Sequence, residues 1–155
     1  MGKYFVGFSA FATTTGNKTS TKIIGAATKR FELVEHVLSG AGTVAPADVQ
    51  HQAKCAFLSG AGAGTPGASP TPEAMDQASS AARCGAGTAY SAEPTTYNTN
   101  VFTLFSCNQR GGMRWSVPQG EGFRSDGGQT GLSLGTLVIS SVAGSVDGQS
   151  MWWEP

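Results

Sequence analysis

Short runs in which apolar and polar residues alternate recur along most of the chain. Between residues 4 and 11, the side chains of Tyr4, Val6, Phe8 and Ala10 fall on one face of an extended strand. Alternation with a period of two is typical of strands that bury one face. The same reasoning predicts further strands at residues 21–25, 29–38, 50–58, 100–107, 113–117, 132–141 and 145–153.

Two of these segments have a less regular pattern. Residues 29–38 also fit a helical stripe, but their short length and β-branched content favour a strand. Residues 100–107 are apolar on both faces, which predicts a strand that is buried on both sides. Seven or eight short strands favour a mainly β protein, in which residues 1–155 form a single antiparallel β-sandwich domain.

Residues 59–96 interrupt the strand pattern and form an inserted segment. Its first part, residues 59–67, is rich in Gly, Ala and Pro and is too simple in composition to pack a core. A short helix is expected after it, with Thr71 as the N-cap, Pro72 in the first turn and Gly85 at the end. Long connections in small domains are commonly functional, so contacts with a neighbouring molecule are expected in this segment.

Charged residues are few, and their signs balance. Ten Lys plus Arg stand against ten Asp plus Glu, and charged residues make up 13% of the chain. This is about half the usual share, which predicts that part of the surface lies against other protein. Zero net charge argues against a nucleic-acid partner. No apolar run approaches the roughly 18 residues of a membrane span, so no membrane partner is expected either.

The three cysteines are too few and too widely spaced for a disulfide framework. Cys55, Cys84 and Cys107 are an odd set, and buried thiols in a reducing cytoplasm are the favoured interpretation. A single Cys55–Cys84 or Cys84–Cys107 bridge is the alternative. Residues 1–6 lack the apolar run and cleavage site of a signal peptide, which agrees with folding in the cytoplasm.

Two motifs that suggest catalysis lack the context that they require. Residues 131–135 match the G-x-S-x-G nucleophile elbow around Ser133, but no His follows and the flanking residues predict a continuous strand. The glycines of residues 60–64 lack the Lys-Ser/Thr ending of a phosphate loop. We therefore expect no enzyme, and we assign no catalytic or cofactor-binding residue.

Metal binding is not expected either. His36 and His51 lie far from each other and have no metal-ligand spacing, so both are predicted to lie on strand surfaces. Glu32 and Glu35 are expected on opposite faces of a strand, where they do not act as an acid–base pair. Two tight-turn signals contain an Asp, with a calcium ion as the less favoured interpretation: Asp126-Gly127 and Asp147-Gly148.

Two adjacent tryptophans near the end of the chain are candidates for an anchor on another subunit or for a sugar platform. If Trp152 and Trp153 lie on a strand, their indoles point to opposite sides, one into the core and one outward. Trp115, on another alternating strand, is predicted to belong to the core. The candidate partner-interface residues are Trp152, Trp153, Ala63, Pro66, Met75 and Pro94.

Five segments of the chain carry a resemblance to known proteins. They are residues 3–12, 91–95, 105–110 (FSCNQR), 113–115 (MRW) and 151–155 (MWWEP). On the basis of these segments, the chain from Asn100 onward, together with residues 3–12 and 91–95, resembles a group of small structural proteins of tailed bacteriophages, over about half of its length. None of them is a catalytic motif. The Gly111-Gly112 pair and the Gly-rich residues 120–128 depart from the pattern of that group, in loops rather than in the framework.

The resemblance implies a jelly-roll-like protein of the phage particle, made in the cytoplasm of the bacterial host. It implies a capsid decoration (cement) protein that sits as a homotrimer on the head surface and contacts the major capsid protein. We expect residues 59–94 and one strand edge to make those contacts. The alternatives are a tail, neck or fibre subunit, a module that recognises a host glycan and, least favoured, a hydrolase that uses Ser133.

Overall fold

The structure, a computed structural model, describes residues 2–26, 29–41, 49–58, 64–125 and 133–155. In these residues the chain forms strands and turns, and no helix. The strands are β1 (Gly2–Thr13), β2 (Lys18–Ile24), β3 (Glu32–Gly40), β4 (Gln50–Leu58), β5 (Glu73–Ala74), β6 (Gly85–Thr88), β7 (Phe102–Asn108), β8 (Met113–Ser116), β9 (Phe123–Arg124), β10 (Ser133–Ser140) and β11 (Gly144–Glu154).

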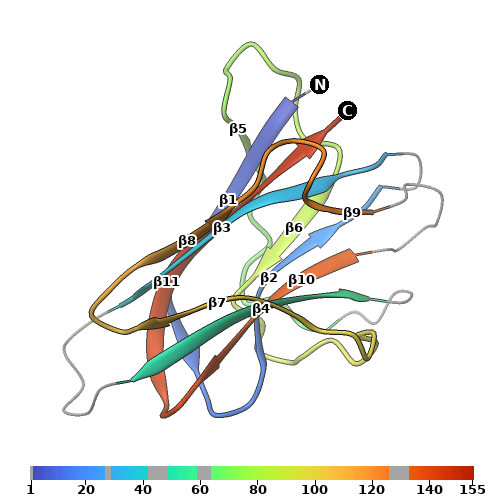
Figure 1. The fold of residues 1–155 in the computed structure, drawn as a ribbon. Helices are drawn as coiled ribbons and strands as arrows, with labels where there is room; N and C mark the ends of the chain where they lie inside the picture. The colour runs from blue at the N-terminus through green and yellow to red at the C-terminus, as the bar shows by residue number, and fades with distance from the viewer. Residues whose placement is uncertain (1, 27–28, 42–48, 59–63, 126–132) are drawn as a thin grey trace.

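The main strands form two antiparallel sheets that face each other (Figure 1). One sheet has the order β5-β1-β11-β3-β8, with the short β9 also paired to β3, and the other has the order β6-β2-β10-β4-β7. The pairing proceeds from the two ends of the sequence toward its middle: β1 pairs with β11, β2 with β10, β3 with β8 and β4 with β7. Successive pairs belong alternately to the one sheet and to the other. This is the arrangement of a jelly roll, so the expected β-sandwich is confirmed.

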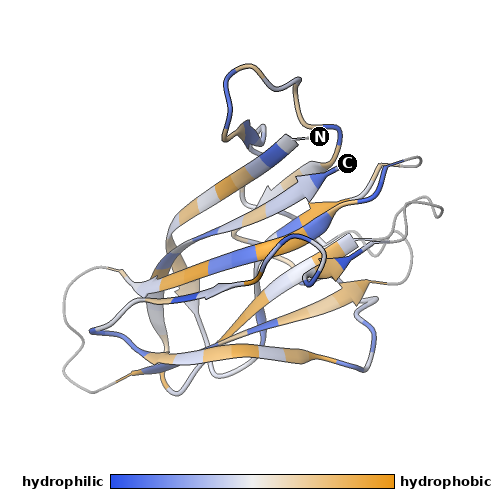
Figure 2. Cartoon of the chain, turned by 45° about the horizontal axis from the view of Figure 1, so that its top comes forward, coloured by the Kyte–Doolittle hydropathy of each residue, from blue (hydrophilic) through white to orange (hydrophobic). Residues whose placement is uncertain are grey.

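The core lies between the two sheets and is built from the residues of each strand that point inward. Figure 2 shows hydrophobic and hydrophilic residues alternating along several strands. One core cluster surrounds Trp152, Leu33 and Ile23, and a second surrounds Phe8 and Leu38 nearer the other end of the same strands. The first and last strands close the fold side by side, with Gly2 opposite Glu154.

A bulge in β1 changes which residues face the core. The register of β1 against β11 shifts between Phe8 and Phe11, and Ala10 has a positive φ of 49°. The backbone N–H of Ala10 donates to the Asp147 carboxylate at 2.7 Å. Ala10 is therefore exposed and Phe11 is buried, whereas simple alternation predicts the reverse.

A second bulge, in β3, places two glutamates on one face. Glu32 lies opposite Trp153 and Glu35 opposite Met151, with one extra residue in β3 between them. Directly opposed residues of an antiparallel pair point to the same side, and Trp153 and Met151 lie two positions apart. Both glutamates therefore lie on the outer face of the sheet, and the expectation of opposite faces is wrong because the bulge inverts the alternation.

The inserted segment extends both sheets on one side instead of forming the expected helix. β5 pairs with β1, and β6 pairs with β2. Met75 donates its N–H to the carbonyl of Lys3 at 2.8 Å, and Asp76 accepts from the backbone of Ala78 and Ser79 in a turn. Met75 is 53% exposed, and pairing with β1 determines the conformation of this segment.

Two carboxylates fasten the inserted segment to the sandwich. Glu154, at the end of β11, accepts the backbone N–H groups of Arg83 and Cys84 at 2.8 and 3.0 Å and the indole N–H of Trp152 at 3.0 Å. Glu93 accepts the backbone N–H of Thr19 at 2.7 Å and also binds the Thr19 hydroxyl. Because these carboxylates receive several N–H and O–H donors, they hold the segment against the edges of β1 and β2.

Candidate functional site

Within the described residues, one side of the sandwich is covered and the opposite side is open. The inserted segment covers the β1 and β2 side, whereas β7 and β8 are the last strands of their sheets on the other side. The expectation that residues 100–107 are buried on both faces is wrong, because in a two-layer sandwich one face of each sheet points outward, and Thr103 and Ser106 of β7 are exposed. Val101 is 40% exposed and Phe102 is 43% exposed.

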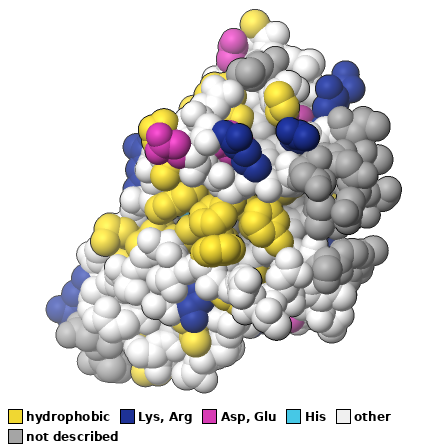
Figure 3. All heavy atoms as spheres, turned by 45° about the vertical axis from the view of Figure 1, so that its right-hand side comes forward, with side chains coloured by type: hydrophobic (Ala, Val, Ile, Leu, Met, Phe, Trp, Pro, Cys, Tyr) yellow, Lys and Arg dark blue, Asp and Glu magenta, His cyan; other side chains and the backbone are white. Residues whose placement is uncertain are grey.

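Aromatic side chains cluster where this open side leaves the interior accessible. Phe102 of β7 contacts Phe123 of β9, with ring centroids 5.0 Å apart, and Phe123 contacts Trp115 of β8 at 5.5 Å. Leu104, Trp115 and Phe123 also pack against the core. We call Phe102, Leu104, Trp115 and Phe123 the aromatic edge. Figure 3, which brings the β9 side of Figure 1 forward, shows apolar side chains gathered near the middle of the visible face.

Two arginines with buried carboxylate partners lie on strands of this side. Arg114 of β8 donates to Glu35 at 2.5 Å, and Arg124 of β9 lies 3.5 Å from Glu32. The carboxylates are almost fully buried, whereas the side chains of Arg114 and Arg124 are 63% and 55% exposed. Each glutamate therefore has its own cation, and an acid–base pair is not formed.

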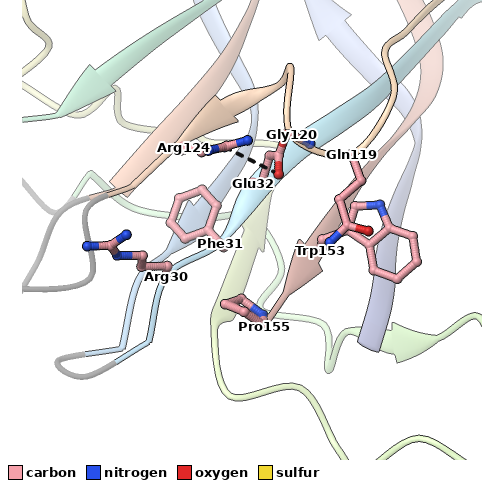
Figure 4. Close-up of a pocket in the computed structure, with 8 residues that line it drawn as sticks. All are labelled: Arg30, Phe31, Glu32, Gln119, Gly120, Arg124, Trp153 and Pro155. Atoms are coloured by element: carbon pink, nitrogen blue, oxygen red, sulfur yellow. Dashed lines mark hydrogen bonds and ion pairs between the residues drawn. The ribbon is translucent and has the colours of Figure 1, made fainter. Parts of the chain in front are cut away.

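A pocket of about 400 Å³ lies beside the aromatic edge, between the start of β3, β9 and the end of β11 (Figure 4). Its lining residues are Arg30, Phe31, Glu32, Gln119, Gly120, Arg124, Trp153 and Pro155. Glu32 Oε1 accepts the backbone N–H groups of Gly120 and Gly122, both at 2.7 Å. This carboxylate therefore fixes the turn that forms one wall. Gly120 has a φ of +101°, which favours glycine at this position of the turn.

The structure separates the six candidate interface residues. Trp152 has no exposed area and Pro94 is buried, so both pack within the chain. Trp153 points outward and is half-buried in the pocket wall, so the prediction of one inward and one outward indole is confirmed. Met75 is exposed and Pro66 is half-buried, both in the inserted segment, and Ala63 lies outside the described residues.

Both histidines are buried, so the prediction that they lie on strand surfaces is wrong. His36 has no exposed area and stacks between the rings of Phe8 and Phe105, at centroid distances of 6.5 and 6.1 Å. Its Nδ1 lies 3.0 Å from the Ser150 hydroxyl, and burial lowers its pKa to about 4. His51 lies 2.7 Å from the Ser140 hydroxyl, and burial lowers its pKa as well.

All three cysteines are free and buried, which confirms the prediction of buried thiols without a disulfide. Burial raises the pKa of Cys55 to about 12 and that of Cys84 to about 11, and it also raises the pKa of Cys107. The thiolate is the reactive form, so these thiols are inert while the fold is intact.

We therefore expect iodoacetamide at pH 8 to leave all three thiols of the folded protein unmodified and to modify all three in concentrated urea. Intact-mass measurement distinguishes zero from three carbamidomethyl groups. Modification of Cys55 in the absence of urea, at the rate of the unfolded chain, would contradict the burial described above.

The remaining motifs give no site in the described residues. Ser133 begins β10, is buried, and lies opposite Ile24 and Leu58, which confirms a strand in place of a nucleophile elbow. Asp147 belongs to β11, while Asp126 and the glycines at 60 and 62 lie outside the described residues. In the described part of the chain, no group of three or more His, Cys, Asp or Glu is placed to hold a metal ion. No helix in that part is long and apolar enough to cross a membrane.

Comparison of the chain with protein-family models, curated proteins and solved structures found no match. The aromatic edge and the pocket are therefore the candidate sites. Of the residues that line the pocket, the sequence pattern proposes Trp153 alone as a contact residue. The one signal for the aromatic edge is the two-sided apolar pattern of residues 100–107, which by itself predicts burial inside the protein.

Proposed function

We propose that this chain is a non-enzymatic structural protein of a phage particle, a capsid decoration (cement) protein that binds the assembled head. The observation that carries the proposal is the aromatic edge, on the open side of a jelly roll whose other side is covered. Jelly rolls are common among viral capsid proteins, as well as among lectins and cupins. The low charge and the sequence resemblance to phage structural proteins support the same assignment.

The aromatic edge suits a protein partner. Edge strands offer unpaired backbone N–H and C=O groups, and monomeric proteins normally protect them. Aromatic residues with a half-exposed ring, such as Phe102, are the kind that dominate binding energy when a partner excludes water from them.

A decoration protein acts through the free energy with which it binds the shell. A protein that binds the assembled shell, and not its free subunits, stabilises the shell by mass action. We place the major capsid protein at the aromatic edge and a homotrimer at the three-fold positions of the head, where three modest contacts add by multivalency. The exposed Met75 and the half-buried Pro66 of the inserted segment are candidates for contacts between copies.

The test begins with the number of copies in purified virus particles, measured by quantitative mass spectrometry against the major capsid protein. A number comparable to that of the shell protein supports decoration of the head. A few copies per particle would instead support a tail, neck or fibre subunit, and absence from particles would overturn the proposal.

The variant Phe102→Ser should weaken binding of the purified protein to assembled heads by about tenfold to a hundredfold, because it removes a central apolar contact. The measurement is co-sedimentation with heads that lack the protein. Val142→Ser is the matched control, since Val142 is 50% exposed and lies in the turn between β10 and β11. Equal binding by both variants would remove the aromatic edge from the interface.

A further inference from the structure

The pocket beside β9 is lined by an indole and by charged side chains. The indole of Trp153 contributes apolar surface, while Arg30 and Arg124 are cationic (Figure 4). Among the side chains that line the pocket, Glu32 is the anion. Its volume of about 400 Å³ falls within the range of small-molecule sites, about 300–1,000 Å³.

The Glu32 carboxylate is fully used by the protein itself. One of its oxygens accepts two backbone N–H groups of the turn, and the other pairs with Nε of Arg124 at 3.5 Å. Arg124 is 55% exposed, and because its ion pair uses Nε, its outer nitrogens can donate to a ligand. Glu32 therefore orients an arginine toward the pocket instead of neutralising the site.

The same contacts disfavour a phosphate group as the ligand. Phosphate sites in proteins are commonly built from backbone N–H groups that converge on the anion. Here the N–H groups of Gly120 and Gly122 that converge at the pocket wall are bound to Glu32. The groups that remain for a ligand are the guanidinium of Arg124, which pairs well with a carboxylate, and the indole of Trp153, over which Lys3 Nζ lies 6.0 Å from the ring centroid.

We propose that this pocket binds an acidic saccharide, a pyranose ring that carries a carboxylate. The C–H face of a pyranose is apolar and stacks on an indole such as Trp153, while its carboxylate pairs with Arg124. This site is separate from the aromatic edge, because Phe123 and Arg124 are neighbours on β9 and point to opposite faces. Saccharide binding therefore goes beyond the proposed function in the head and does not depend on it.

The test is a titration of the ¹⁵N-labelled full chain with methyl β-D-glucuronide, followed by NMR. The chain has three tryptophans, so the indole N–H region is simple, and Trp153→Phe assigns the signal of Trp153. We expect the glucuronide to shift this signal and to leave those of Trp115 and Trp152 in place. Methyl β-D-glucoside, which lacks the carboxylate, should bind at least about tenfold more weakly.

Variants at two exposed arginines complete the test. Arg124→Gln should weaken glucuronide binding by about tenfold, since it removes a charge-assisted pair. The turn remains held, because Glu32 keeps its two backbone N–H donors. Arg110→Gln, in the turn between β7 and β8, is the matched control and should bind like the unmodified chain. The proposal is overturned if no ligand shifts the Trp153 signal, or if the glucoside or inorganic phosphate binds as tightly as the glucuronide.

Discussion

Replacing Trp152 by alanine is expected to destabilise the protein by about 3–5 kcal/mol, a large share of the stability of a typical domain. Trp152 has no exposed area, and its ring lies 6.4 Å from that of Tyr4 in the main core cluster. Its indole N–H also donates to Glu154, the carboxylate that holds the backbone of Arg83 and Cys84. The substitution therefore opens a cavity and loosens the fastening of the inserted segment at the same time.

The neighbouring residue provides the control. Trp153→Ala removes an indole of the same size from the outer face of the same strand, and we expect it to cost about 1 kcal/mol or less. Urea unfolding followed by circular dichroism gives both free energies of unfolding. For Trp152→Ala the midpoint of thermal unfolding should also fall by on the order of 10 °C. Similar losses for the two variants would contradict the placement of Trp152 in the core and Trp153 outside it.

The contrast between the two tryptophans shows what the sequence can predict about this fold. Alternation along residues 145–153 is enough to separate an inward from an outward indole, because strand geometry alone decides it. It fails where the strand departs from regular geometry, at Ala10 in the β1 bulge and between Glu32 and Glu35 in the β3 bulge. A bulge depends on hydrogen bonds to another strand, such as that from Ala10 to Asp147, which local pattern does not reveal.

The candidate sites are harder to predict, because they depend on strand order. An apolar face of β7 has the same sequence pattern in the middle of a sheet as at its edge, and only the pairing with β4 alone makes Phe102 an exposed residue. In the same way, the pocket brings together Arg30, Gln119 and Trp153 from distant parts of the chain. The missing helix near Thr71 has a comparable cause, since pairing with β1 outweighs local capping signals.

Acid should destabilise this protein through His36 at pH values where most carboxylates are still ionised. The pKa of His36 is about 4 in the folded protein, because burial disfavours the imidazolium, and it returns to about 6.5 on unfolding. Since the unfolded chain then binds the extra proton, stability is constant above pH 6.5, falls as the pH drops toward 4, and levels off below it. The total loss from this group is about 3 kcal/mol, of which about 2 kcal/mol appears by pH 5.

The variant His36→Asn isolates this contribution. Asn has no titration in this range and keeps a polar group near the Ser150 hydroxyl, which lies 3.0 Å from Nδ1 of His36. The variant will be less stable at neutral pH, because the imidazole that fills the space between Phe8 and Phe105 is lost. The informative quantity is therefore the change in the free energy of unfolding between pH 7.5 and pH 5, measured in urea for each protein. We expect this change to be smaller in the variant by about 2 kcal/mol, and His51, whose pKa burial also lowers, contributes to the change in both proteins. An equal pH dependence in the two proteins would contradict this prediction. It would mean that His36 is protonated as readily in the folded chain as in the unfolded one, despite its enclosure between two aromatic rings.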